Sequence, residues 1–168
     1  MMKTSAALKS KSGFTVLLAI ACAVLPACQA TTDAQAWKWS EPAFAGIPDP
    51  GKLAELSGLA RSNSHAGVFW AINDGGNPAE IIAINAKAGP LAAVSIEGIG
   101  NIDWEDIASY SADGRNYLAI ADTGDNGGIR SELFIHILEE PDNMQAQAIK
   151  PLRSLRFVWK DGARDTEA

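Results

Sequence analysis

The sequence is poor in several residues on which common kinds of chemistry depend. It has two cysteines, Cys22 and Cys28, so the chain beyond them has no thiol pair for a disulfide or a cysteine-based zinc site. Its two histidines, His65 and His136, are too few for a histidine zinc site, and His136 lies inside an apolar run typical of a strand. The longest apolar run, Phe14–Leu25, would span about 18 Å as a helix, whereas a bilayer core needs about 30 Å.

Basic residues are also outnumbered, with 14 lysines and arginines against 20 acidic residues and a net charge of −6. No basic patch is present, which argues against a nucleic-acid partner and favours cationic ones. No serine stands in a nucleophile-elbow sequence, so the sequence predicts no Ser/His/Asp triad. The segment Gly98–Gly100 is not followed by a helical pattern, which argues against a dinucleotide site.

The N-terminus has the pattern of an export signal. Lys3, Lys9 and Lys11 precede the apolar run, and no acidic residue accompanies them. The run ends in LPAC, which resembles a lipobox and predicts cleavage before Cys28 and lipidation of its thiol. An ordinary signal peptide cut near Ala27 or Ala30 is the alternative.

Three regions follow from this interpretation: a signal peptide (1–27), a lipidated cysteine with a polar tether (28–40), and a domain (41–168). Removal of the three signal lysines leaves eleven basic residues against twenty acidic ones, so the mature surface is strongly acidic. Gln29 after the cysteine favours the outer membrane, facing the periplasm or the cell surface. The expected membrane contact is the lipid anchor.

The domain has the pattern of an all-β protein. Short apolar runs alternate with clusters of Gly, Asn, Asp and Pro, which is typical of many short antiparallel strands. We predict eight strands, at residues 57–61, 68–73, 80–85, 90–96, 104–110, 116–122, 132–138 and 152–159. Asp142–Lys150 is predicted to be either a short helix or a loop.

An internal repeat organises these strands. ELSGLA (55–60) aligns with DWEDIA (103–108), and WAINDGGN (70–77) aligns with LAIADTGD (118–125), both at the same offset and without a gap. A shorter echo, DTEA, occupies 165–168. Repeated groups of four short antiparallel strands are typical of β-propeller blades. We therefore expect about two blades and the start of a third, so that the chain is part of a longer propeller. A β-sandwich or open barrel is the alternative, although it predicts no repeat.

These motifs resemble a family of bacterial secreted or lipid-anchored β-propellers. That family is distantly similar to the calcium-binding six-bladed propellers of the gluconolactonase, paraoxonase and esterase-like phytase groups. The resemblance covers residues 53–168 and is most specific in DWED and DTGDN. It implies a propeller fold and a calcium ion at the blade ends.

Oxygen-bearing side chains gather at one predicted end of the blades, where first strands begin and second strands end. Hard cations such as calcium take six to eight oxygen ligands, so these residues are a candidate calcium site. Individually, the Asp-Gly and Asn-Gly pairs are also good turn formers. The candidate metal ligands are Asp74, Asp103, Glu105, Asp122 and Asp125, and the candidate binding residues are Asn73, Asn77, Trp104 and Asn126.

Two functions fit this pattern. The first is an anchored module that binds an unidentified small molecule or protein through its acidic end. The second is a calcium-dependent hydrolase of an ester, lactone or phosphoester, in which a cation activates water. A general base beside the metal would separate the second from the first.

Overall fold

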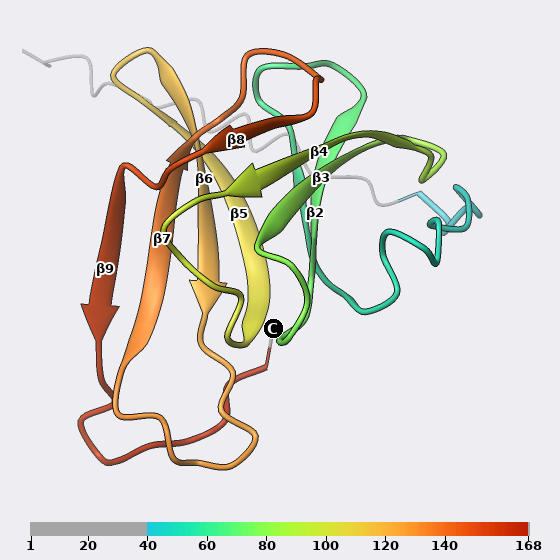
Figure 1. Ribbon diagram of the computed structural model, residues 1–168. Coiled ribbons are helices and arrows are strands. Elements are labelled where there is room, and N and C mark those ends of the chain that lie inside the picture. The colour runs from blue at the N-terminus through green and yellow to red at the C-terminus, as the bar shows by residue number, and fades with distance from the viewer. Residues whose placement is uncertain (1–39, 168) are drawn as a thin grey trace, which may run out of the picture. The chain divides into compact units, whose positions relative to one another are not determined.

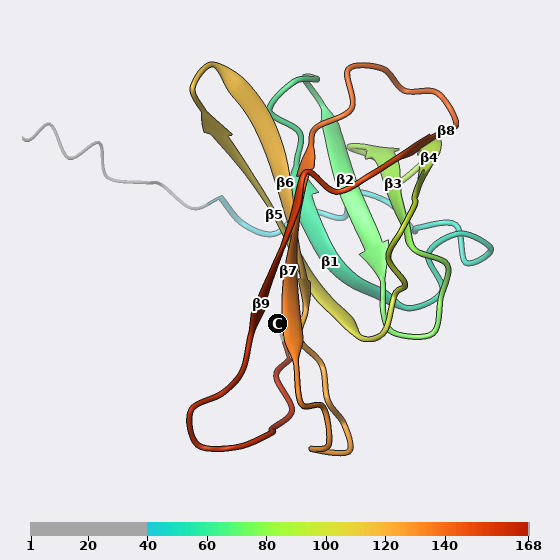
Figure 2. The ribbon, with the colours of Figure 1, turned by 60° about the vertical axis from the view of Figure 1, so that its left-hand side comes forward.

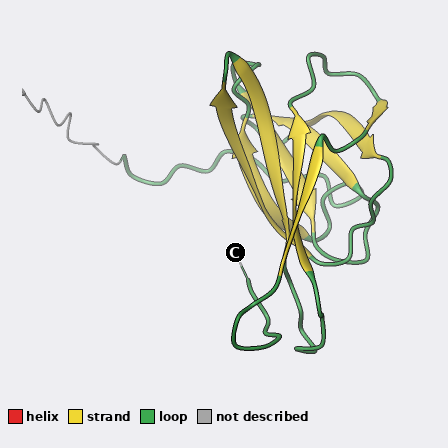
Figure 3. Cartoon of the chain, turned by 90° about the vertical axis from the view of Figure 1, so that its left-hand side faces the viewer, coloured by secondary structure: helices red, strands yellow, loops and turns green. Residues whose placement is uncertain are grey.

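The computed structural model describes residues 40–167. The predicted signal peptide, Cys28 and all of the predicted tether except Ser40 lie outside this range. The described chain consists of strands and loops and contains no helix (Figure 3). Accordingly, it has no helix that could cross a membrane.

Two β-sheets form the domain (Figure 1). In the first sheet, four consecutive strands pair antiparallel, and a fifth adds to the outer edge in parallel with β4. Its members are β1 (Leu56–Arg61), β2 (Val68–Asn73), β3 (Glu80–Asn85), β4 (Pro90–Ile96) and β8 (Gln147–Ile149).

The second sheet repeats the antiparallel arrangement without an added strand. It contains β5 (Trp104–Ala112), β6 (Arg115–Asp122), β7 (Leu133–Glu139) and β9 (Arg153–Phe157). All eight predicted strands are therefore present, three of them with the predicted bounds. They form an all-β fold of two four-stranded antiparallel repeats.

The segment Asp142–Lys150 is not a helix. It runs as a loop and then forms β8, which pairs with the outer edge of β4. The outer edge of β4 has free N–H and C=O groups with which this segment can form hydrogen bonds. A short helix without tertiary contacts is only marginally stable, so the strand is favoured. Pairing with a distant strand therefore decided the structure of this segment.

The main core lies between the two sheets. Trp70 and Ile72 from the first sheet pack with Leu118, Ile120 and other buried side chains of the second. The sheets come closest where β5 lies beside β1 and β2 (Figure 2). Gly58 permits this approach, since a Cβ there would lie 2.8 Å from the backbone nitrogen of Ile107. The first strands of the two repeats are thus neighbours.

The strand pairing corrects the gap-free alignment of the repeats. Ala60 pairs with Trp70, and its aligned equivalent Ala108 pairs with Ala119. By strand pairing, the counterpart of Trp70 is therefore Ala119. The gap-free alignment instead gives Leu118 as the equivalent of Trp70, one position earlier. A shift of one position moves a side chain to the other face of a sheet.

This register shows how the sheets are stacked. Trp70 faces the second sheet, while its counterpart Ala119 lies on the face of the second sheet that points away from the first. Equivalent faces therefore point in the same direction, as in a stack of like units rather than two facing halves. The outward face of the second sheet also carries Ile135 and Ile137, both partly exposed.

Candidate metal site

Three of the predicted ligands meet at one end of the two sheets. Asp74 follows β2, Asp103 precedes β5, and Glu105 is the second residue of β5. One carboxylate oxygen from each lies within 4.8 Å of the others, so that a single ion could contact all three. The predicted convergence of these three side chains is confirmed, since the fold brings Asp74 to the two later acids although β3 and β4 lie between them in the sequence. Their role as metal ligands stays a prediction.

Glycines in the two turns let the backbone approach these carboxylates. A Cβ on Gly75 would lie 2.6 Å from Oδ1 of Asp103, and one on Gly124 would overlap the carboxylates of Asp103 and Glu105. The Asn101 side chain secures the same region, since its Nδ2 donates to the carbonyl oxygens of Asn73 (2.9 Å) and Asp74 (2.7 Å). Side chains larger than hydrogen at the two glycines would push the acids apart.

Burial and the proximity of other acids raise the pKa values of two residues of the cluster. Burial raises the pKa of Glu105 to about 7, and the charges of Glu167 and Asp74 add to this effect. Burial also raises the pKa of Asp103, helped by the charge of Asp74 and a hydrogen bond with it. Glu105 is only 5% exposed. Among residues 40–167, no basic side chain forms an ion pair with any of the three acids.

Asp122 lies next to this cluster but has other partners. Its Oδ1 lies 2.8 Å from Nη1 of Arg130 and accepts a hydrogen bond from the Asp103 amide at 3.2 Å. Arg130 also donates to the carbonyl oxygen of Gly124 at 2.7 Å. The arginine therefore pairs with Asp122 and, within the described chain, not with the three clustered acids.

Asp125 shapes the loop after β6. Its carboxylate accepts the amides of Ile129 (2.8 Å) and Arg130 (2.9 Å), which close the turn. Its own amide donates to Oδ1 of Asp165 at 2.8 Å. The structure thus brings Asp74, Asp103 and Glu105 together, and gives Asp122 and Asp125 charge-pairing and turn-forming contacts.

The predicted binding residues divide in a similar way. Asn77 belongs to the site, because its Nδ2 donates to Oε2 of Glu55 (2.7 Å) and to the carbonyl oxygen of Asp74 (3.0 Å). Asn73 holds the preceding segment through the carbonyl oxygen of Lys52. Trp104 is fully buried in the core, and Asn126 is exposed.

Three further polar residues at the site, Glu55, Ser57 and Glu167, were not predicted from the sequence. A cavity of about 280 Å³ lies against the cluster and is lined by Glu55, Leu56, Ser57, Asp74, Glu105 and Glu167. The repeat held the signal for them. Glu55 and Ser57 occupy the places of Asp103 and Glu105 one repeat earlier, and Glu167 occupies the corresponding place in the DTEA echo.

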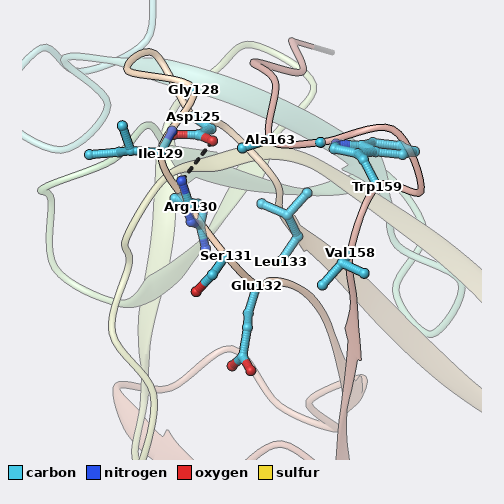
Figure 4. A pocket seen from close by; sticks show the side chains of 11 residues that line it. Asp125, Gly128, Ile129, Arg130, Ser131, Glu132, Leu133, Val158, Trp159 and Ala163 are labelled. Atoms are coloured by element: carbon cyan, nitrogen blue, oxygen red, sulfur yellow. Dashed lines mark hydrogen bonds between the residues drawn. The ribbon is translucent and has the colours of Figure 1, made fainter.

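A second cavity, of about 360 Å³, lies between the loop after β6 and the segment after β9 (Figure 4). Leu133, Val158 and Trp159 form its apolar part, and Arg130 and Glu132 lie on its other side. Asp125 reaches its rim, but none of the three clustered acids lines it. It is therefore separate from the candidate metal site.

Comparisons with family models, curated proteins and solved structures gave no match to this chain. Its class is therefore given by the structure alone: an all-β domain of two stacked, mainly antiparallel sheets, with a three-carboxylate cluster that could hold a metal ion.

Proposed function

We propose that this protein is a lipid-anchored, extracytoplasmic binding module of the β-propeller type that holds calcium in its acidic cluster and binds a ligand there. The observation that carries the proposal is the convergence of Asp74, Asp103 and Glu105 within 4.8 Å, with no basic side chain of the described residues paired to them. Gathering ionised carboxylates in a partly buried place is costly unless a cation compensates.

The propeller component is supported by the stacking of the sheets. In a propeller, blades follow one another with equivalent faces in the same direction, and their first strands lie closest to the axis. The first feature agrees with the common direction of Trp70 and its counterpart Ala119, and the second is supported by the contact of β1 with β5. Ser57, Glu105 and Glu167 are at equivalent places in successive repeats and line one cavity, as expected near such an axis.

Calcium suits this donor set better than a softer metal. All candidate ligands are oxygens, and zinc or copper would want imidazole or thiolate. Three carboxylates supply fewer than the six to eight oxygens that calcium takes, and the adjoining cavity leaves room for others. A ligand rich in oxygen atoms could complete the coordination, which makes the cation part of the binding surface.

A calcium titration of the full chain tests this proposal. At a hundredfold excess over the dissociation constant, calcium should stabilise the fold by about 2.7 kcal/mol, and a chelator should reverse the gain. Asp103→Asn should abolish most of it. Glu97→Asn is the matched control, because Glu97 is an exposed acid outside the cluster and forms an ion pair with Lys150. An unchanged melting temperature, or an equal gain in Asp103→Asn, would refute the calcium site.

A calcium-dependent hydrolase is the second candidate, because Glu167 lines the cavity beside the cluster without being one of its three carboxylates. A carboxylate in that position can accept a proton from a water molecule in the cavity. Calcium in the cluster would supply polarisation of the scissile group. Hydrolysis of an ester, lactone or phosphoester at this site should then depend on calcium, and Glu167→Gln should remove the calcium-dependent activity. If calcium binds but no hydrolysis depends on it, the binding module remains and the calcium-dependent hydrolase is excluded.

A further inference from the structure

The second sheet brings a serine, a histidine and an aspartate into line, although the sequence predicted no such triad. Ser154 on β9 and His136 on β7 are direct cross-strand partners, so their side chains lie on the same face. Nδ1 of His136 lies 2.8 Å from Oγ of Ser154. Nε2 of the same ring lies 3.6 Å from Oδ2 of Asp122, the last residue of β6. The adjacency of β6, β7 and β9 creates this row (Figure 1).

The surroundings fix the roles of the two ring nitrogens. Asp122 is 1% exposed and is held in place by Arg130 and by the Asp103 amide. Its negative charge favours the tautomer with the proton on Nε2, which leaves the lone pair of Nδ1 to accept the Ser154 hydroxyl. The ring of Phe134 stacks parallel to that of His136, with centroids 5.7 Å apart. Asp122 and Ser154, at the ring nitrogens, and Phe134, stacked on the ring, therefore fix the orientation of the imidazole.

The three side chains of the row differ in solvent exposure, as expected for a nucleophile at the surface and a base shielded behind it. Ser154 is exposed, whereas His136 and Asp122 are buried behind it. Ser154 therefore lies at the surface, where a substrate can approach it, and solvent is kept from the base. The row is built from residues that do not belong to the three-carboxylate cluster.

We propose that Ser154 is a nucleophile for acyl transfer from esters, with His136 as its general base and Asp122 as the positioning residue. Oγ of Ser154 bonds to the ester carbonyl carbon while its proton passes to Nδ1 of His136. The imidazolium then protonates the leaving alkoxide as the ester C–O bond breaks, giving an alcohol and an acyl-serine. Water attacks the acyl-serine by the same proton transfers, which releases the carboxylic acid and restores the serine. No redox partner or metal is needed.

Labelling of the full chain with a fluorophosphonate tests this inference. The probe's phosphorus bonds to the serine oxygen, fluoride leaves, and the hydroxyl proton departs through the histidine. Peptide mapping should place one adduct on Ser154. His136→Gln should slow labelling by about 100-fold or more, as expected for the loss of a general base. Chelation of calcium should leave the rate unchanged, which separates this site from the acidic cluster.

Two controls keep the result clear. Ser154→Ala should abolish the adduct, and this exposed position should tolerate alanine without loss of the fold. Ser111→Ala should label like the natural chain, because Ser111 is an exposed strand serine whose hydroxyl donates to an asparagine instead of a histidine. An adduct spread over several serines, no adduct on Ser154, or labelling insensitive to a folded His136→Gln variant would overturn the proposal.

Discussion

Replacement of Glu140 by glutamine should destabilise the whole domain. Glu140 follows β7 of the second sheet and is 3% exposed, but its carboxylate is held by the loop between β1 and β2 of the first. Oε1 accepts from Oγ of Ser62 (2.5 Å) and from Nε1 of Trp70 (2.8 Å). Oε2 accepts from the amides of Asn63 (3.2 Å) and Ser64 (3.1 Å), and from the Ser64 hydroxyl. One buried carboxylate thus ties the two sheets together.

The magnitude follows from what glutamine cannot do. Its single amide oxygen can replace one carboxylate oxygen, while its NH₂ group must face donors in place of the other. If the oxygen stays with Ser62 and Trp70, the amides of Asn63 and Ser64 lose their acceptor. A hydrogen bond to a charged group contributes about 1.5–3 kcal/mol, and breaking a buried ionic arrangement costs about 3–5 kcal/mol. We expect a loss of about 3–5 kcal/mol, or more than about 10 °C in melting temperature.

Chemical denaturation followed by tryptophan fluorescence measures this loss, because Trp70 is both a partner of Glu140 and part of the core. Glu139→Gln is the control, since Glu139 is half exposed and its ion pair with Arg115, at 3.6 Å, should contribute about 1 kcal/mol or less. A loss in Glu140→Gln no larger than in the control would refute the reasoning. Two separate unfolding transitions in the natural chain would also refute the reasoning, because the contacts of Glu140 with the β1–β2 loop require the two sheets to unfold together.

Three further expectations concern the sheet contact, the site and the anchor. Gly58→Ala should cost about 1–3 kcal/mol of stability, since its Cβ would press on the backbone of β5. In calcium-free buffer, the raised pKa of Glu105 should make its contribution to stability greatest below about pH 4.5 and lost as the pH rises through about 7. Glu105→Gln should flatten that part of the profile, and an unchanged profile would contradict the assigned pKa. Cys28→Ser should release the protein from membranes into the soluble fraction, and a membrane-bound variant would contradict lipidation.

Much of the fold was determined by local sequence pattern. The apolar runs bounded by Gly, Asn and Pro predicted β2, β3 and β4 with their observed bounds, because turn chemistry and side-chain alternation act over a few residues. The repeat placed Asp74, Asp103 and Glu105 at one end of the sheets, because antiparallel connectivity returns the chain to the same edge. These features needed no knowledge of distant contacts.

Long-range pairing decided the rest. The shift by one position between the repeats, which puts Ala119 in the place of Trp70, depends on hydrogen-bond register and not on sequence similarity. β8 exists because the edge of β4 was free to pair with it. The contact of His136 with Ser154 arises because β9 pairs with β7, and the pairing of Asp122 with Arg130 depends on how the loop after β6 folds back. Such contacts reflect packing of the whole domain, and a local pattern carries no signal for them.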